Sequence, residues 1–156
     1  MLSFLIVDED SVVQYLQSII TRVFPEAPVY TASGGTEAWM QIQAHAPAII
    51  FSDLQLPGMS GIDLCKRVRA SERFKDVYFL ILTTNTVKEQ RIEILESGAD
   101  EYLSKPIIME ELTVKLRAAV RIVQMQQRLH AESSKLKAMT EQLERDFDEM
   151  VHLTVG

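Results

Sequence analysis

The sequence of 156 residues contains a single cysteine, and this scarcity limits the sites that it can form. Cys65 alone excludes an intramolecular disulfide and a zinc site built on cysteines. No apolar run approaches the roughly 20 residues that a membrane-spanning helix needs. The apolar residues 1–7 lack the basic region and the cleavage site of a signal peptide. We therefore expect a cytoplasmic protein without a membrane segment.

Basic residues are also too few to suggest a nucleic-acid partner. The formal net charge is −6 and the isoelectric point lies near 5.1. Because contacts to phosphates need clustered lysine and arginine, we expect no direct binding of nucleic acid by this chain. The 47% of hydrophobic residues is ordinary for a globular protein, and the length is sufficient for one domain with a buried core.

Five short apolar runs alternate with stretches whose apolar residues recur at helical spacing. Three of these runs are apolar throughout, as expected of parallel strands that are covered on both faces. The predicted strands are residues 2–7, 28–32, 48–52, 77–82 and 101–104. This alternation predicts an α/β fold with a doubly wound, five-stranded parallel sheet of the flavodoxin-like order 2-1-3-4-5.

The last part of the chain predicts one extended C-terminal helix, because residues 109–153 contain neither glycine nor proline. Apolar residues at heptad spacing form a seam typical of a coiled coil. The seam residues are Ile122, Leu129, Leu136, Leu143 and Met150, together with Met125, Met139 and Leu153. Glu132 and Asp146 occupy other seam positions, which would make the coiled coil weak or adaptable. We expect a domain at residues 1–120 and a helical linker or dimerisation segment at residues 121–156, with a solvated single helix as the alternative.

Reactive side chains follow the predicted strands at the points where these strands end. Asp8 and Glu9 follow the first strand, Asp53 the third, Thr83 the fourth and Lys105 the fifth. In an open parallel sheet these ends meet at one edge, where ligands bind. Two carboxylates 4 Å apart repel each other by about 4 kcal/mol at an effective dielectric constant near 20. The cluster therefore predicts a hard divalent cation such as Mg²⁺.

Four segments of the sequence carry a resemblance to a known family. They are FLIVDED at residues 4–10, IIFSDLQLPGMSG at 49–61, FLILTT at 79–84 and EYLSKP at 101–106. Their order and spacing are similar to those of the receiver domains of two-component response regulators, in the CheY-like superfamily. The resemblance covers residues 2 to about 120 and leaves a C-terminal helical extension.

The resemblance implies a phosphorylation site that uses Mg²⁺. Asp53 would be the phosphoacceptor, and it would take the phosphoryl group from a histidine kinase or a phosphotransfer protein. Glu9 and Asp53 would bind Mg²⁺ directly, Asp8 through water, and Gln55 through its backbone carbonyl. Lys105 would hold the phosphoryl oxygens.

The resemblance also implies a switch that relays the phosphorylated state. Thr83 would donate a hydrogen bond to the phosphoryl group, and Tyr102 would be the aromatic residue that rotates inward with it. The fourth helix, fifth strand and fifth helix would form the switch surface. The state would then pass through the C-terminal helix, which would form a homodimer, to an output domain or partner. Such a chain is a signalling domain and not an enzyme, apart from its own phosphoryl transfer and dephosphorylation.

Some residues depart from the family pattern. Glu9 stands where aspartate is commoner, and Thr84 is bulkier than the frequent alanine. Gln55 and Asn85 occupy two variable positions that influence loss of the phosphoryl group. Neither side chain carries a charge that would activate water, and we predict an intermediate or slow loss. We also expect either a single-domain regulator or, in preference, part of a longer protein whose output domain lies outside this sequence.

Two other functions fit parts of the sequence. A haloacid-dehalogenase-type phosphatase would use Asp8 as nucleophile and Asp10 as acid and base, because residues 8–13 fit its motif after an apolar strand. That function leaves Asp53 and the loop after it unexplained. The second alternative is a receiver-like interaction module that is never phosphorylated.

Overall fold

The computed structural model of the chain describes residues 1–84 and 87–155, without the side chain of Val155. Its main sheet has five parallel strands in the order β2-β1-β3-β6-β7, so the predicted order is confirmed. The strands are β1 (Phe4–Val7), β2 (Val29–Ala32), β3 (Ile49–Asp53), β6 (Tyr78–Thr83) and β7 (Glu101–Ser104).

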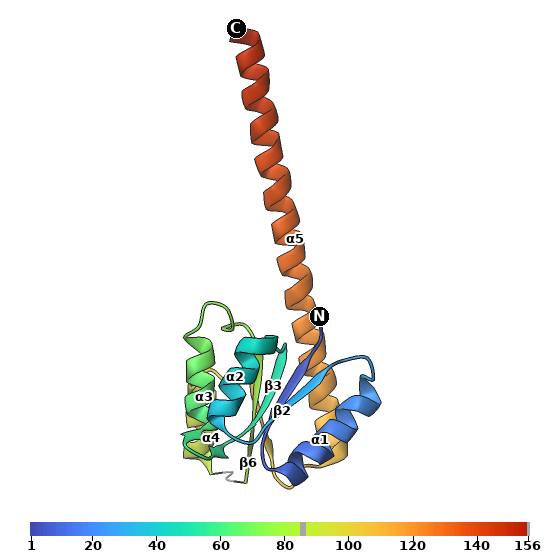
Figure 1. Cartoon of the computed structure of the whole chain (residues 1–156), viewed down its shortest axis with the longest axis vertical. Helices are drawn as coiled ribbons and strands as arrows, with labels where there is room; N and C mark the ends of the chain where they lie inside the picture. The colour runs from blue at the N-terminus through green and yellow to red at the C-terminus, as the bar shows by residue number, and fades with distance from the viewer. Residues whose placement is uncertain (85–86, 156) are drawn as a thin grey trace. The chain divides into compact units, whose positions relative to one another are not determined.

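Helices cover both faces of this sheet (Figure 1). One buried cluster joins the sheet to α1 and the first part of α5, and the other joins it to α2, α3 and α4. The helices are α1 (Asp10–Val23), α2 (Gly35–His45), α3 (Gly61–Arg69), α4 (Lys88–Glu96) and α5 (Met109–Val155). The apolar runs in β1 and β6 are explained by this arrangement, since every side chain of both strands is buried.

A small hairpin follows β3, where the sequence predicts a loop. It consists of β4 (Gln55–Leu56) and β5 (Met59–Ser60), which pair antiparallel around Gly58 at a φ of 74°. Two-residue strands are too short to show periodicity in a sequence. The hairpin packs on the start of α2, where a Cβ on Gly35 would lie 2.7 Å from the Cβ of Met59. Glycine is therefore needed at this contact.

The hairpin leads directly into α3, which has a capping box at its first turn. The Ser60 hydroxyl accepts a hydrogen bond from the Asp63 backbone N–H, and the Asp63 carboxylate accepts one from the Ser60 N–H. Two otherwise unpaired donors of the helix start are thus satisfied. This cap fixes the chain that leaves the end of β3.

The single tryptophan, Trp39, joins α2 to α3. The Arg67 guanidinium lies 4.3 Å from the centroid of the indole ring. The Phe74 ring meets the indole edge-on, with centroids 6.0 Å apart and an interplanar angle of 83°. Both contacts are favourable interactions of an aromatic ring with a cation and with a second ring.

The chain divides into two compact units, one at Met1–Val123 and one that begins at Gln124. A single helix, α5, runs from the first unit through the described part of the second, as the absence of glycine and proline predicted. Within residues 1–84 and 87–155, we find no helix with the length and apolar character that a membrane crossing requires.

Candidate functional site

The carboxyl ends of four strands bring most of the predicted site residues around one open cavity of about 250 Å³. The cavity is lined by Glu9, Asp53, Leu54, Gln55, Thr83, Thr84 and Lys105. These residues are widely separated in the sequence and meet because the strands β1, β3, β6 and β7 are neighbours in the sheet. Asp8 and Tyr102 do not line this cavity.

Asp8 is the most deeply buried charged group of the site, with a side-chain exposure of 0%. Its Oδ1 accepts a hydrogen bond of 2.7 Å from the backbone N–H of Glu9. Its Oδ2 lies 2.8 Å from Nζ of Lys105, with which it forms an ion pair. Burial raises the pKa of the Asp8 carboxyl group, and the contacts with Lys105 and Glu9 oppose that rise only in part.

Lys105 lies between two carboxylates. Besides its ion pair with Asp8, its Nζ lies 3.3 Å from Oδ1 of Asp53. Its backbone N–H donates a hydrogen bond of 2.8 Å to the carbonyl of Thr83, which ties the end of β7 to the end of β6. The peptide bond between Lys105 and Pro106 is cis. The ammonium group therefore stands where it can contact a ligand bound at Asp53.

Asp53 ends β3 and remains accessible, with 23% of its side chain exposed. Its Oδ1 accepts a long hydrogen bond of 3.4 Å from the backbone N–H of Gln55. A Cβ on Gly61 would collide with the backbone oxygen of Asp53, so the helix start approaches the strand end as closely as glycine allows. The Asp53 carboxylate is thus fixed at its backbone and open at its tip.

Glu9 lies at the rim of the cavity, exposed to solvent. Its Oε1 accepts a hydrogen bond of 3.3 Å from the hydroxyl of Ser11, and its backbone caps α1. Asp10 is also exposed and begins α1, and it does not line the cavity. Glu9 and Asp10 are neighbours in the sequence, but only Glu9 borders the cavity.

The two predicted switch residues differ in burial. Thr83 is 1% exposed, whereas Tyr102 is half-buried and packs on the cluster under α2, α3 and α4. The Lys115 ammonium donates a hydrogen bond of 2.9 Å to the Tyr102 carbonyl and lies 5.5 Å from its ring centroid. Asn85, one of the two predicted determinants of phosphoryl loss, lies outside the described residues.

The site offers oxygen donors that fit Mg²⁺. Within residues 1–84 and 87–155, no three side chains of His, Cys, Asp or Glu gather closely enough to hold a metal ion by themselves. The carboxylates of Glu9 and Asp53 border the same cavity as Gln55, and the buried carboxylate of Asp8 is ion-paired with Lys105, which also lines that cavity. A hard cation that keeps several waters suits such a set of carboxylate and carbonyl oxygens.

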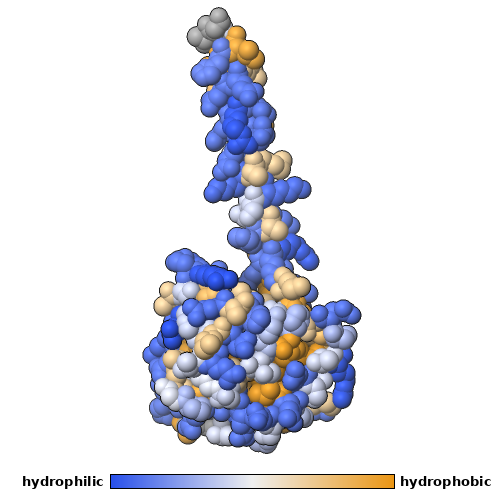
Figure 2. All heavy atoms as spheres, in the orientation of Figure 1, coloured by the Kyte–Doolittle hydropathy of each residue, from blue (hydrophilic) through white to orange (hydrophobic). Residues whose placement is uncertain are grey.

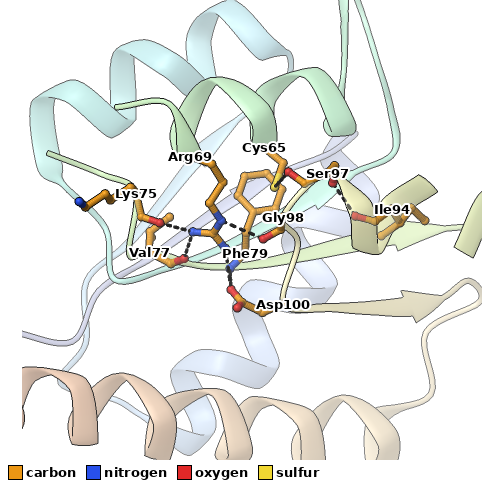
Figure 3. A network of polar contacts seen from close by, with 9 residues as sticks. All are labelled: Cys65, Arg69, Lys75, Val77, Phe79, Ile94, Ser97, Gly98 and Asp100. Atoms are coloured by element: carbon orange, nitrogen blue, oxygen red, sulfur yellow. Dashed lines mark hydrogen bonds and ion pairs between the residues drawn. The ribbon is translucent and has the colours of Figure 1, made fainter. Parts of the chain in front are cut away.

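A polar network that the sequence analysis missed lies at the other ends of the strands (Figure 3). The guanidinium of Arg69 donates to the carbonyls of Lys75, Val77 and Gly98 at 2.7, 2.5 and 2.8 Å. It also pairs with Asp100 Oδ2 at 2.8 Å, and the same oxygen accepts from the Phe79 N–H. Because most partners are backbone carbonyls, which every residue has, the sequence carries no signal for this network.

The order of the strands and the helices on both faces of the sheet are shared with solved response-regulator structures. Residues 4–117 match the family model of the response regulator receiver domain, and the chain belongs to this family. The family assignment, the fold and the C-terminal helix predicted from the sequence are therefore confirmed.

Similar proteins include regulators that the match spans almost completely and others that it spans in part. Chemotaxis protein CheY1 of Helicobacter pylori is 32% identical over 121 residues, which are 76% of this chain and 97% of that protein. The DNA-binding response regulator MtrA of Mycobacterium tuberculosis is 35% identical over 119 residues, but the match spans only 50% of its length. The solved structure of the chemotaxis response regulator CheY4 of Vibrio cholerae is 32% identical, with a TM-score of 0.71 over 76% of this chain and 98% of that one.

Proposed function

We propose that this chain is a phosphorylation-dependent switch that accepts a phosphoryl group on Asp53 from a histidine kinase or a phosphotransfer protein. The observation that carries the proposal is the accessible Asp53 carboxylate, 3.3 Å from the Lys105 ammonium, in an open cavity at the carboxyl ends of the strands. Membership of the receiver family supports the same function.

Phosphoryl transfer needs in-line positioning and neutralisation of charge more than covalent chemistry from the protein. An oxygen of the Asp53 carboxylate forms a bond to phosphorus while the bond from phosphorus to the donor nitrogen or oxygen breaks, and the donor leaves with that electron pair. Lys105 contacts a phosphoryl oxygen, and the buried Thr83 donates a hydrogen bond to another. The carboxylates of Asp8 and Glu9 line or support the cavity without taking part in the new bond.

Glu9, Asp53 and the Gln55 carbonyl would hold Mg²⁺, with Asp8 acting through water. The ion would neutralise negative charge on the carboxylates and on the incoming phosphoryl group. The carboxylates of Glu9 and Asp53, which line the same cavity as Gln55, support this assignment. The roles of the individual ligands are part of the proposal.

The switch would act on the face formed by α4, β7 and α5. Movement of the Thr83 hydroxyl toward the phosphoryl group would allow Tyr102 to rotate inward. Apolar side chains are exposed on this face, among them Ile92 and Leu95 of α4 and Val114 of α5. The state would pass through α5, which would pair with a second copy of the chain, to an output domain or a partner.

The alternatives have less support. A phosphatase that uses Asp8 as nucleophile needs that carboxylate to reach its substrate, but the Asp8 side chain has an exposure of 0%. Its acid and base, Asp10, is outside the cavity. A receiver-like module that is never phosphorylated has no such obstacle, and it is separated from our proposal only by experiment.

The test is to treat the chain with acetyl phosphate and MgCl₂ and to follow the intact mass. We expect one added phosphoryl group in the unchanged chain, none in Asp53→Asn, and the normal amount in the matched control Asp10→Asn. Loss of the modification on removal of Mg²⁺ with EDTA would support the metal assignment. A chain that is not modified by acetyl phosphate or by a panel of histidine kinases would contradict the proposal and favour the unphosphorylated module.

A further inference from the structure

The helix beyond residue 123 exposes an apolar stripe that nothing in the described chain covers. Every side chain from residue 124 to residue 154 is exposed. Its large apolar residues lie among strongly hydrophilic ones (Figure 2). They are Met125, Leu129, Leu136, Met139, Leu143, Phe147, Met150, Val151 and Leu153. Since an isolated helix gains little stability in water without a packed apolar face, this stripe favours a partner helix.

The charges of this helix are divided between its two halves. Residues 124–140 contain three basic residues and one acidic residue: Arg128, Lys135 and Lys137, against Glu132. Residues 141–154 contain five acidic residues and one basic residue: Glu141, Glu144, Asp146, Asp148 and Glu149, against Arg145. The first half is therefore positive and the second half negative. A partner that complements both halves carries the same two blocks of charge in the opposite direction.

We propose that this partner is a second copy of the same helix in antiparallel orientation, an inference that rests on the dimer proposed above. A parallel pair would set the positive halves against each other and the negative halves against each other. An antiparallel pair sets each positive half against a negative half. Electrostatic complementarity of this kind fixes the orientation and the register of two surfaces.

The seam positions agree with the antiparallel orientation. In a parallel pair, Glu132 would face its own copy across the seam, and so would Asp146, with like charges in contact. In the antiparallel pair the apolar positions still meet, with Leu136 beside Met139 of the partner subunit. Asp146 then faces Leu129 of the partner subunit, so no two carboxylates share a layer.

The same register brings a cation to the acidic half. With Met125 opposite Met150 of the partner subunit, Arg128 comes alongside Asp146 and Glu149 of the partner subunit. These two carboxylates lie three residues apart, on the same side of the helix. Because the pair is symmetric, the contact forms twice. Arg128 is therefore the residue whose charge the orientation needs most.

The experiment uses the full chain with one added cysteine. Met125→Cys and Met150→Cys are made separately, one of them uniformly labelled with ¹⁵N, then mixed and oxidised. Residues 125 and 150 are about 37 Å apart along a helix, so a disulfide between two chains reports one orientation only. We expect disulfides between Met125→Cys and Met150→Cys chains and none between like chains. The unchanged chain, whose only cysteine is buried, is the control.

Disulfides between like chains would show a parallel pair and overturn the antiparallel orientation, while leaving the dimer in place. A chain that sediments as a monomer at all concentrations would overturn both the dimer and its orientation. Larger oligomers with no preferred disulfide would show a staggered assembly and would also overturn the antiparallel pair. Phosphorylation of Asp53 is measured separately by intact mass, so none of these results would contradict the proposed function.

A second measurement tests the charges. Arg128→Glu should raise the dissociation constant of the dimer at least tenfold, whereas Lys137→Glu, with the same change of charge outside the seam, should raise it less than threefold. Added NaCl should weaken the unchanged dimer, because it screens attractive pairs. A dimer that tightens with salt would overturn the proposed complementarity. An equal effect of the two variants would overturn the contact assigned to Arg128 and, with it, the proposed register.

Discussion

Lys105 and Asp8 form the most consequential pair of residues in the site. The Asp8 carboxylate is buried, its pKa is raised by that burial, and the ammonium at 2.8 Å is the nearest opposite charge. Buried ion pairs often contribute little net stability, yet removal of one partner is costly because it leaves an uncompensated charge. The effect of losing Lys105 therefore depends on whether the Asp8 carboxylate is still present.

We predict that Lys105→Met lowers the free energy of unfolding by about 3 kcal/mol at neutral pH and in EDTA, because it leaves the Asp8 carboxylate buried without a cation. Asp8→Asn in the same chain should restore most of this loss. Urea unfolding followed by circular dichroism measures both effects. Equal stabilities of Lys105→Met with and without Asp8→Asn would show that the buried charge is not the cause.

Cys65 gives a prediction about pH. Its thiol is buried beside the Ser97 carbonyl, with Sγ 3.6 Å from that oxygen, and burial raises its pKa. An acid with a raised pKa in the fold stabilises the fold below the pKa of the unfolded state, and this stability is lost as the pH rises through the folded pKa.

The free energy of unfolding should therefore fall from about pH 9 upward by as much as roughly 1.4 kcal/mol for each pH unit, until the folded thiol ionises. Cys65→Ala should show a smaller slope, although the variant is less stable at every pH because of the cavity that it creates. Denaturant titrations at a series of pH values measure the slopes. Reaction of the thiol with Ellman's reagent should also require unfolding, and rapid reaction in native buffer would contradict this prediction.

At the scale of elements, the approach of α3 to the end of β3 depends on Gly61. A Cβ at this position would collide with the backbone oxygen of Asp53. We predict that Gly61→Ala displaces the phosphoacceptor, destabilises the fold by about 2 kcal/mol and slows phosphorylation by acetyl phosphate. Rates from intact mass and urea titrations measure the two effects.

Gly34 supplies the matched control, because a Cβ there would have its nearest neighbour at 3.7 Å, an ordinary contact with the Pro57 oxygen. Gly34→Ala should leave both the stability and the phosphorylation rate close to those of the unchanged chain. If both alanine variants behaved alike, the close approach at Gly61 would not be the reason for a glycine.

The network around Arg69 holds the end of α3, the turn before β6 and the turn before β7 together. We predict that Arg69→Met lowers the free energy of unfolding by about 3 kcal/mol, since three carbonyls each lose a donor and the Asp100 carboxylate keeps only the Phe79 N–H. Arg67 lies on the same helix as Arg69, and Arg67→Met removes only its contact with the Trp39 ring. This variant should lower the free energy of unfolding by about 1 kcal/mol or less. Thermal and urea unfolding compare the two, and equal losses would contradict a special role for Arg69.

The sequence predicted the elements of the fold better than it predicted their contacts. Uniformly apolar strands and helical spacing are repeated signals, so the sheet order and the long helix could be inferred. The hairpin after β3 escaped detection because two-residue strands have no period. At the site, the strand ends predicted which side chains meet, but not that Lys105 lies between Asp8 and Asp53. Distances between side chains depend on packing, which no local pattern encodes.

For the whole molecule, the boundary after Val123 leads to a prediction about stability. The buried side chains of α5 end at Val123, and those from residue 124 to residue 154 are exposed. A chain that ends at Val123 should therefore have the same free energy of unfolding as the first unit of the full chain, within about 0.5 kcal/mol. Urea titrations of both chains measure it.

The same shortened chain should be monomeric, whereas the full chain should dimerise. Analytical ultracentrifugation over a range of concentrations measures this difference. Equal self-association of the two chains would remove the C-terminal helix as the dimer contact and would place it on another surface.

Trp39 determines what light emission from this protein can report. It is the only tryptophan, and it contacts Arg67 of α3 and Phe74, which follows α3; Thr83 and Tyr102 belong to other elements. Its fluorescence should follow the loss of packing between α2 and α3 during denaturation. Trp39 lies on neither α4 nor β7, so a time-resolved fluorescence study of events on α4 would need an added fluorophore there.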